Sequence, residues 1–439
     1  MLDIKFIREN PDKVKKAISD RGMDLDLNEF LSLDEERRKL LLEVEELKHQ
    51  KNVVSDEVGR LLKGKKDAKE KILNMKVVSQ KIDEIDKKVV EISQKLTKIA
   101  YLIPNIPHFS IPVAKDASGN KVILNWGKFP EFDFKPRDHM ELAGLLDIID
   151  FPRASKISGA GFVLYKGIGA RLERALINFM LDLHTKKHGY TEVLPPFLVN
   201  RQSMTGTGQL PKLEEDMYRL KDDDLFLVPT AEVPVTNIFR DEILKEEDLP
   251  VYYTAYTACF RREAGSYGKD TKGLIRVHQF DKVELVKFVK PETSYDELEK
   301  LRADAEEVIQ LLGLPYRVVM LCTADLSFAA SKCYDIELWA PGIGKYLEVS
   351  SCSNFEDFQA RRANIKFKRT TPACLADRVG RQANARRTAQ YVHTLNGSGV
   401  ALARLVIAIL EVYQQKDGSI IIPEVLRPYL DSIKQITPA

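Results

Sequence analysis

The sequence has no long hydrophobic run, no secretory leader and little glycine or proline. Its longest apolar stretches, such as 405–410, are far shorter than the ~20 residues of a membrane-spanning helix, so we expect no membrane partner. Acidic residues at positions 3, 9, 12 and 20 interrupt any leader, which favours a cytoplasmic protein. With 23 glycines and 20 prolines among 439 residues, the chain is neither collagen-like nor broadly disordered.

Cysteine and net charge are also scarce. The five cysteines, at positions 259, 322, 333, 352 and 374, form no CxxC pair and no close Cys/His spacing. We therefore expect reduced thiols in the core instead of a disulfide framework or a zinc site. A net charge of +2 neither requires nor excludes a nucleic-acid partner, so the distribution of charge is more informative than its sum.

The first hundred residues contain two heptad patterns. Apolar positions recur at alternating spacings of three and four residues over 33–61, where Arg37 and Lys51 fill two positions, and again over 75–99. This spacing is typical of a coiled-coil seam. The connecting segment 62–67 is short and contains Gly64, so the two helices must run antiparallel within one chain. Helices of about 35 residues would form an arm roughly 50 Å long.

The tip of this arm is basic. Six cations surround the turn, and the acidic residues among them are Asp67 and Glu70; the cations are Arg60, Lys63, Lys65, Lys66, Lys69 and Lys71. Clustered positive charge of this kind suits contacts with phosphates. The alternatives are a solvated surface and a generic coiled-coil dimerisation element.

Prolines in the segment 103–112 end the helical pattern and predict a domain boundary. We expect one domain over 1–103, where a short helix at 4–21 precedes the arm, and a second over 104–439. In the second domain, helical patterns at 167–188, 296–312 and 400–413 accompany β-rich segments at 225–228, 252–262, 274–288 and 317–321. Strands joined by hairpin-like turns indicate an antiparallel sheet flanked by helices, so the predicted fold class is α+β.

The most informative segment is 252–288, where two β-rich runs flank a loop with three glycines. Because alternate side chains share one face of a strand, we expect Arg261 to lie beside Glu263 and Phe280 beside Glu284. A cation, an aromatic ring and two carboxylates on one surface suit a substrate with phosphate, a purine base and an ammonium group. The alternatives are a core position for Phe280 and an ion pair between Glu284 and Lys282 or Lys287.

These segments resemble a known family. The sequence FRRE at 260–263 resembles motif 2 of the class II aminoacyl-tRNA synthetases, and NGSGVALAR at 396–404 resembles motif 3, whose glycines open a helix that presents Arg404. The helix 167–188, followed by LPPF at 194–197, resembles motif 1, the dimer-forming element. The segment TAE at 230–232, the loop 264–268 and the basic-tipped arm narrow the resemblance to bacterial seryl-tRNA synthetases, over essentially the whole chain.

The resemblance implies roles for the matching residues. Arg261 resembles the arginine that holds the ATP α-phosphate and the substrate carboxylate, while Phe280 and Arg404 would flank adenine. The set implied for ATP is Arg261, Arg262, Glu263, Val277, His278, Gln279, Phe280, Glu348, Val349, Ser350, Ser351 and Arg404. Glu348 and Ser351 are the implied Mg²⁺ ligands, and the implied catalytic residues are Arg261, Arg404 and Glu348.

The resemblance also implies a serine site, formed by Thr230, Ala231, Glu232, Arg261, Glu284 and Ser398. Ser398 is equally a candidate N-cap of the last helix. The implied reaction joins L-serine to ATP as seryl-adenylate and then transfers serine to tRNA(Ser), in a homodimer whose arm contacts the tRNA through its six tip cations. Whether tRNA(Sec) is charged as well stays open. The alternative is a synthetase-like paralogue that acts as a binding or regulatory module. The segment 369–390 is longer and more basic than the family predicts, and its role is open.

Overall fold

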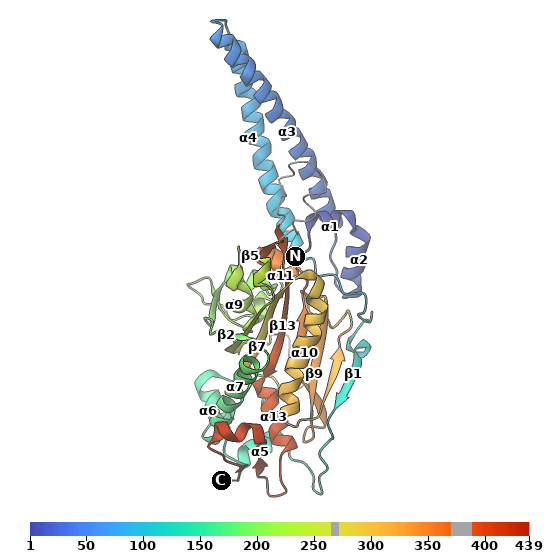
Figure 1. Ribbon diagram of the computed structural model, residues 1–439, viewed down its shortest axis with the longest axis vertical. Helices are drawn as coiled ribbons and strands as arrows, with labels where there is room; N and C mark the ends of the chain where they lie inside the picture. The colour runs from blue at the N-terminus through green and yellow to red at the C-terminus, as the bar shows by residue number, and fades with distance from the viewer. Residues whose placement is uncertain (265–271, 370–388, 439) are drawn as a thin grey trace. The chain divides into compact units, whose positions relative to one another are not determined.

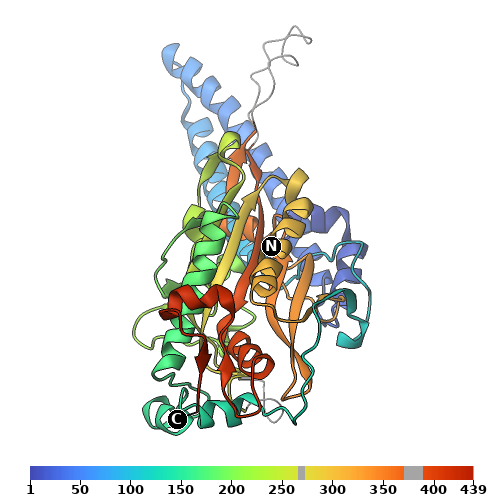
Figure 2. The ribbon, with the colours of Figure 1, turned by 60° about the horizontal axis from the view of Figure 1, so that its bottom comes forward.

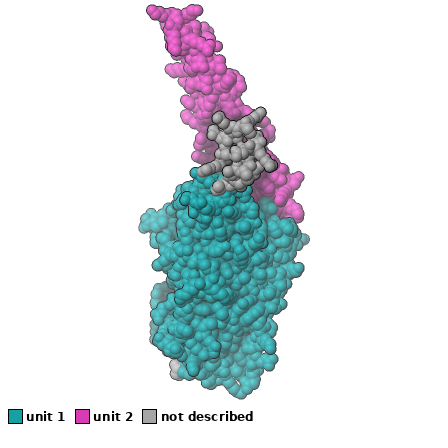
Figure 3. Space-filling view, in the orientation of Figure 1, with its two compact units in different colours: residues 1, 105–439 teal, residues 2–104 magenta. Residues whose placement is uncertain are grey.

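The computed structural model describes residues 1–264, 272–369 and 389–438. The chain divides into two compact units, residues 2–104 and residues 105–439 together with Met1 (Figure 3). The predicted class, a helical hairpin followed by an antiparallel sheet with flanking helices, is confirmed.

The N-terminal unit begins with two short helices instead of the single helix predicted over 4–21. They are α1 (Ile4–Glu9) and α2 (Pro11–Asp20), separated by Asn10, which has φ −132° and ψ 50°. Proline at the first position of α2 explains the break, because its ring disfavours helical geometry in the preceding residue while fitting the first turn of a new helix.

The long hairpin consists of α3 (Asn28–Lys63) and α4 (Lys69–Ala100) (Figure 1). All of the predicted seam positions are buried or half-buried, whereas apolar residues off the seam, such as Leu42 and Leu73, are exposed. Polar contacts cross between the helices in antiparallel order, from Arg37 Nε donating to Ser93 Oγ (3.3 Å) near the base to the Glu57–Lys71 ion pair near the tip. The heptad pattern therefore closes within one chain, as predicted.

The larger unit is built on an eight-stranded sheet with the order β1-β8-β9-β10-β13-β7-β6-β2, antiparallel except for the β2–β6 pair. The strands are β1 (Lys121–Trp126), β2 (Thr191–Glu192), β6 (Val251–Phe260), β7 (Gln279–Val289), β8 (Tyr316–Met320), β9 (Lys332–Ala340), β10 (Lys345–Asn354) and β13 (His393–Ala401). Smaller sheets join β5 (Ile243–Lys245), β11 (Lys366–Lys368) and β12 (Ala389–Tyr391), β3 (Leu198–Asn200) and β4 (Leu225–Leu227), and β14 (Ile420–Ile421) and β15 (Gln435–Ile436).

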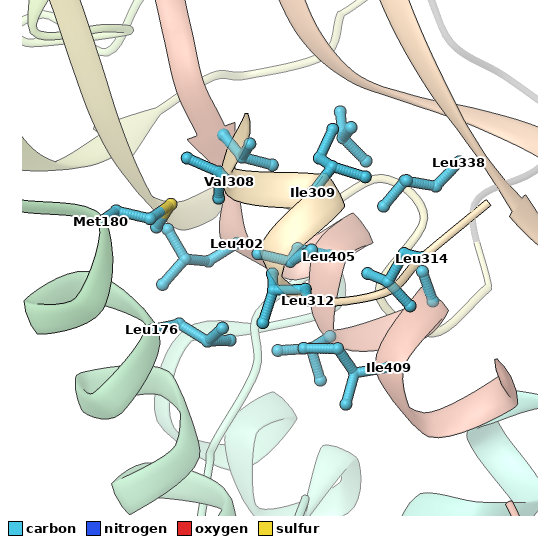
Figure 4. Packing of buried hydrophobic residues seen from close by; sticks show 14 of the residues in the cluster. Leu176, Met180, Val308, Ile309, Leu312, Leu314, Leu338, Leu402, Leu405 and Ile409 are labelled. Carbon is cyan, nitrogen blue, oxygen red and sulfur yellow. The ribbon is translucent and has the colours of Figure 1, made fainter. Parts of the chain in front are cut away.

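Three helices, α7 (Ile168–Lys186), α10 (Ser294–Leu311) and α13 (Leu402–Val412), cover one face of the sheet (Figures 1 and 2). Their apolar side chains interlock in the main core, which Figure 4 shows for Leu176, Met180, Val308, Ile309, Leu312, Leu402, Leu405 and Ile409. The remaining α-helices of the described residues are α5 (His139–Leu145), α6 (Phe151–Ser158), α8 (Arg201–Thr207), α9 (Glu232–Thr236) and α11 (Phe358–Ala363).

Strand β7 separates two cores. Val283 and Leu285 belong to the core beneath α7, α10 and α13, whereas Val286 and Phe288 belong to a second core with residues of α9 and α11. Because side chains alternate along a strand, Lys282 and Glu284 point to the same side of the sheet as α9 and α11. The candidate site therefore lies on the face opposite the three long helices.

The motif 3 region differs from the prediction. Helix α13 begins at Leu402, and the glycines predicted to open it lie inside strand β13. A Cβ atom on Gly397 would lie 2.3 Å from Leu301 Cδ2, and one on Gly399 would lie 2.8 Å from His184 Nε2. Glycine is needed here because α7 and α10 approach the strand closely, which propensity alone does not reveal.

The described cysteines and helices agree with two further expectations. Cys259, Cys322, Cys333 and Cys352 are buried free thiols, whereas Cys374 lies outside the described residues. Among the helices of the described residues, none combines the length and the hydropathy needed to cross a membrane.

Candidate active site

Strands β6 and β7 form the floor of the candidate site. Their register places Ala255 opposite Glu284 and Thr257 opposite Lys282. Residues directly opposite each other share a face, so small side chains flank two charged ones. Lys282 and Glu284 are only 5% and 1% exposed, and buried charges require partners.

Glu284 finds those partners in a polar triangle. Thr230 Oγ1 donates a hydrogen bond to Glu284 Oε2 (3.0 Å), Lys282 Nζ donates to Thr230 Oγ1 (2.9 Å), and Lys282 forms an ion pair with the same Glu284 oxygen. Of the two ion-pair alternatives, the one with Lys282 is present. Lys287 points to the other face and pairs with Glu297 (3.0 Å).

A second buried carboxylate, Glu232, lies close to this triangle. Gln359 Nε2 donates to Glu232 Oε1 (2.6 Å), and the Gln359 oxygen accepts a hydrogen bond from Thr394 (2.8 Å), which fixes the orientation of the amide. Burial, followed by the nearby negative charge of Glu284, raises the pKa of Glu232 to about 7. The site therefore contains a carboxyl group that is half-protonated near neutral pH.

Arg261 lies at the end of the same hairpin. Its guanidinium carbon is 5.3 Å from the centre of the Phe280 ring, and its Nε donates to the carbonyl of Pro229 (3.3 Å). The positive charge is near enough to lower the pKa of Glu232, so this cation belongs to the same pocket. Phe280 is half-buried and also packs against the main core, so the core alternative is partly correct.

The expected alternation of Arg261 and Glu263 is wrong. Strand β6 ends at Phe260, and Glu263 has the left-handed φ of 52°, so its carboxylate pairs with Arg276 (3.0 Å). The side chain of Arg262 donates to the carbonyl of Glu215 (3.0 Å), and both residues line a pocket with Glu214, Met217, Tyr218 and Arg219.

The other predicted adenine residues follow this turn. His278 Nδ1 lies 3.0 Å from the carbonyl oxygen of Arg261, Val277 is buried in the main core, and the Gln279 side chain is exposed. Parts of two segments from the sequence analysis lie outside the described residues. They are residues 265–268 of the loop 264–268 and residues 370–388 of the basic segment 369–390.

Arg404 and Glu348 form a second cluster. Arg404 Nε donates to the carbonyl of Ile275 (3.1 Å), and one terminal nitrogen donates to the carbonyl of Glu348 (2.7 Å) and lies 3.5 Å from its carboxylate. The Arg404 side chain is 27% exposed and that of Glu348 is 48% exposed. Both charges are thus held in place and remain accessible to a ligand.

A bulge in β10 brings Glu348 and Ser351 to one face. Residues three apart on a regular strand point to opposite sides, but the register slips between Glu348 and Ser350, so that Ser351 lies opposite Asp335 and Glu348 lies opposite Glu337. Burial, followed by the charge of Glu348, raises the pKa of Asp335 well above its usual range. Val349 is buried in the main core, and Ser350 donates to the backbone carbonyl of Ser398 (2.6 Å).

Ser398 lies in strand β13, directly opposite Glu284. The N-cap alternative for Ser398 is wrong, because α13 starts four residues later, at Leu402, with Ala401 at its cap position. The structure therefore brings Thr230, Glu232, Arg261, Glu284 and Ser398 into one polar cluster. Ala231 is buried beneath it in the second core.

Sequence reasoning missed two polar residues of this pocket. Lys282 was treated only as an alternative partner for Glu284, although its position on the same face as Glu284 was a usable signal. Gln359 lies far from the motifs in sequence and reaches Glu232 only through the packing of α11 against α8 and β13. No local pattern marks it.

The predicted cations of the arm tip are all exposed. Lys71, however, forms an ion pair with Glu57, an acidic residue that lies one turn before the predicted tip. Its charge is thus partly neutralised, whereas Arg60, Lys63, Lys65, Lys66 and Lys69 surround the turn between α3 and α4.

Comparison with known proteins explains this arrangement. The family model of the seryl-tRNA synthetase N-terminal domain matches residues 1–107, and that of the tRNA synthetase class II core domain (G, H, P, S and T) matches residues 217–413. The serine–tRNA ligase of Thermodesulfovibrio yellowstonii is 58% identical over 433 residues, which cover 98% of this chain and 99% of that protein. This chain belongs to the seryl-tRNA synthetase family.

Other members of the seryl-tRNA synthetase family agree over the full length. The serine–tRNA ligase of Carboxydothermus hydrogenoformans is 58% identical over 430 residues, which cover 98% of this chain and 98% of that protein. The crystal structure of seryl-tRNA synthetase from Pyrococcus horikoshii, complexed with ATP, covers 100% of both chains at 40% identity with a TM-score of 0.91. The resemblance stated from the motifs is thus confirmed, and the enzyme class is that of the class II synthetases.

Proposed function

We propose that this chain is a serine–tRNA ligase that activates L-serine with ATP and transfers it to tRNA(Ser). The observation that carries the proposal is the polar cluster around Glu284, in which Arg261 offers a cation for the carboxylate of serine, and Glu232 and Glu284 offer carboxylates for its ammonium group. Full-length similarity to serine–tRNA ligases supports the same assignment. The proposal gives each charged group of the pocket a role.

In the first step, a carboxylate oxygen of serine attacks the α-phosphorus of ATP, and the bond to the bridging oxygen of pyrophosphate breaks. Arg261 would hold the serine carboxylate and the α-phosphate, while Glu232 and Glu284 would bind the ammonium group. Arg404 would lie against adenine and offset negative charge. The protein therefore acts by positioning and by preorganised charge.

In the second step, the terminal ribose hydroxyl of tRNA attacks the seryl carbonyl, and AMP leaves. The exposed cations of the arm tip would hold the RNA backbone through phosphate contacts. Recognition of double-stranded RNA by shape and backbone suits such an arm.

The residues fit a bound Mg²⁺, which would neutralise charge on the ATP phosphates. The bulge in β10 gives Glu348 an accessible carboxylate on the same face as the Ser351 hydroxyl. The described residues contain no group of three or more acidic, histidine or cysteine ligands, but Mg²⁺ at phosphate sites uses one or two carboxylates together with the substrate. Glu348 and Ser351 are the ligands that we propose.

We also propose a homodimer through α7 and the segment that follows β2. Strand β2 is an exposed edge of the sheet, and Leu194, two residues beyond it, is 76% exposed. An edge strand beside an exposed apolar residue favours a self-complementary twofold interface. The alternative function, a binding or regulatory module, would keep the fold without catalysis.

Pyrophosphate exchange distinguishes the two functions. A purified ligase exchanges labelled pyrophosphate into ATP when serine is present. Alanine lacks the hydroxyl and should be rejected by about 10⁴-fold or more, as is usual for a pocket built around a hydrogen-bonding group. Serine binding without exchange would favour the regulatory module.

A further inference from the structure

We propose that Lys282 is a positioning residue of the serine site: directly and through the hydroxyl of Thr230, it fixes the carboxylate of Glu284 in the orientation that receives the substrate. The inference rests on the proposed function and assigns to that site a residue for which no role was predicted. This role follows from the limited hydrogen-bonding capacity of three buried groups, the Lys282 ammonium, the Thr230 hydroxyl and the Glu284 carboxylate.

A lysine ammonium group has donors and no acceptor. Because Lys282 Nζ contacts Thr230 Oγ1 (2.9 Å), the threonine oxygen must accept that hydrogen bond. The same oxygen accepts from the backbone N–H of Glu232 (3.2 Å). Both acceptor positions are therefore used, and the hydroxyl hydrogen has one direction left, toward Glu284 Oε2 (3.0 Å).

The carboxylate of Glu284 is held by the same arrangement. Oε2 receives the Thr230 hydroxyl and the Lys282 ammonium group, so the plane of the carboxylate is fixed, and we assign Oε1 to the substrate ammonium. All three residues are at most 5% exposed, which limits competition from water. Lys282 thus acts through Thr230 and Glu284 without a contact to serine of its own.

Lys282 also controls the charge of the pocket. Glu232 faces Glu284, Gln359, Lys282 and Arg261, and the positive charge of Lys282 is one of the influences that lower the pKa of Glu232. Without this cation, the two carboxylates would oppose each other's ionisation more strongly. A neutral residue 282 should therefore weaken the binding of the serine ammonium and move its pH dependence to higher pH.

The test is K282M, which keeps the length of the side chain and removes the ammonium group. We expect the KM for serine in pyrophosphate exchange to rise about 100-fold, in line with the loss of one partner of a buried, hydrogen-bonded charge pair, while the KM for ATP changes less than twofold. The pH above which the KM for serine decreases should also be higher in K282M than in the parent. An unchanged KM for serine, or equal effects on serine and ATP, would overturn the proposal.

The matched control is K287M. Lys287 lies on the same strand, is 1% exposed and pairs with Glu297 (3.0 Å), but it points to the opposite face. K287M should lower stability and leave the KM for serine and its pH profile unchanged. A parallel rise in the KM for serine would show that any buried lysine of β7 has this effect, and the proposal would fail.

A double variant keeps the proposal testable if K282M does not fold. K282M/E284Q removes both charges of the ion pair, which proteins tolerate better than the loss of one partner. If Lys282 acts through Glu284, the double variant should bind serine no more weakly than E284Q, and a further tenfold loss would overturn the inference. The unmodified chain tests the proposed function separately, because it must show exchange whatever K282M does.

Discussion

Replacing Glu232 with glutamine should make the protein more stable in alkaline solution while it destroys serine activation. Burial and the charge of Glu284 raise the pKa of Glu232 from its ordinary value of 4.5 to about 7. The folded state therefore binds this proton more tightly than the unfolded state, and stability is lost as the pH rises from about 4.5 to 7. Gln359 can continue to donate to the oxygen of a glutamine at this position.

The expected size of the stability change follows from the shift in the pKa of Glu232. A change of about 2.5 pKa units corresponds to about 3 kcal/mol between pH 4.5 and 8. For a unit the size of residues 105–439, this amounts to about 4 °C in melting temperature. E232Q has no proton to lose at position 232. The melting temperature of E232Q minus that of the parent should therefore be about 4 °C higher at pH 8 than at pH 5.

Thermal melting by circular dichroism at both pH values, without substrate, measures this difference. E131Q removes an exposed loop carboxylate and is the control, whose difference from the parent should stay constant. Added serine should stabilise the parent at pH 8 and leave E232Q unaffected. If E232Q and the parent respond equally to pH, the carboxyl group is not the buried, substrate-facing group described here.

Three further predictions concern other parts of the molecule. R261A should reduce seryl-adenylate formation about 10²–10³-fold in a folded protein, since it removes one preorganised donor at the transition state; unchanged exchange would remove Arg261 from the mechanism. G397A should cost about 1–3 kcal/mol, because its Cβ would lie 2.3 Å from Leu301 Cδ2, whereas G144A, with open space around it, should not destabilise in thermal melts. Replacing 45–85 with a short Gly/Ser turn should leave pyrophosphate exchange intact and strongly reduce tRNA charging; charging at the parental rate would show that the arm does not recognise tRNA.

The arm could be predicted from the sequence because its structure depends on local periodicity. A seam of alternating three- and four-residue spacings needs only its own two helices to become buried. Two details of this unit could not be read from the heptad pattern, because they depend on backbone geometry and on the pairing of the two helices. The break at Pro11 and the pairing of Lys71 with Glu57 follow from backbone restriction and from the register between the helices.

The catalytic unit was less predictable, because packing across distant segments decides it. Gly397 and Gly399 have low strand propensity, yet they lie in β13, where glycine is needed because Leu301 and His184 leave no room for a side chain. The bulge that aligns Glu348 with Ser351 is visible only in the pairing of β10 with β9. Motif residues were found through the family resemblance, whereas Gln359 became visible only through its contact with Glu232.

The most direct test of the central claim is aminoacylation itself. Purified protein is incubated with ATP, Mg²⁺, labelled serine and a tRNA(Ser) transcript, with tRNA(Sec) and an unrelated tRNA assayed in parallel. We expect an alkali-labile seryl ester on tRNA(Ser), formed with one AMP released per serine attached, and none on the unrelated tRNA. Failure to charge tRNA(Ser), or charging with another amino acid in preference to serine, would contradict it.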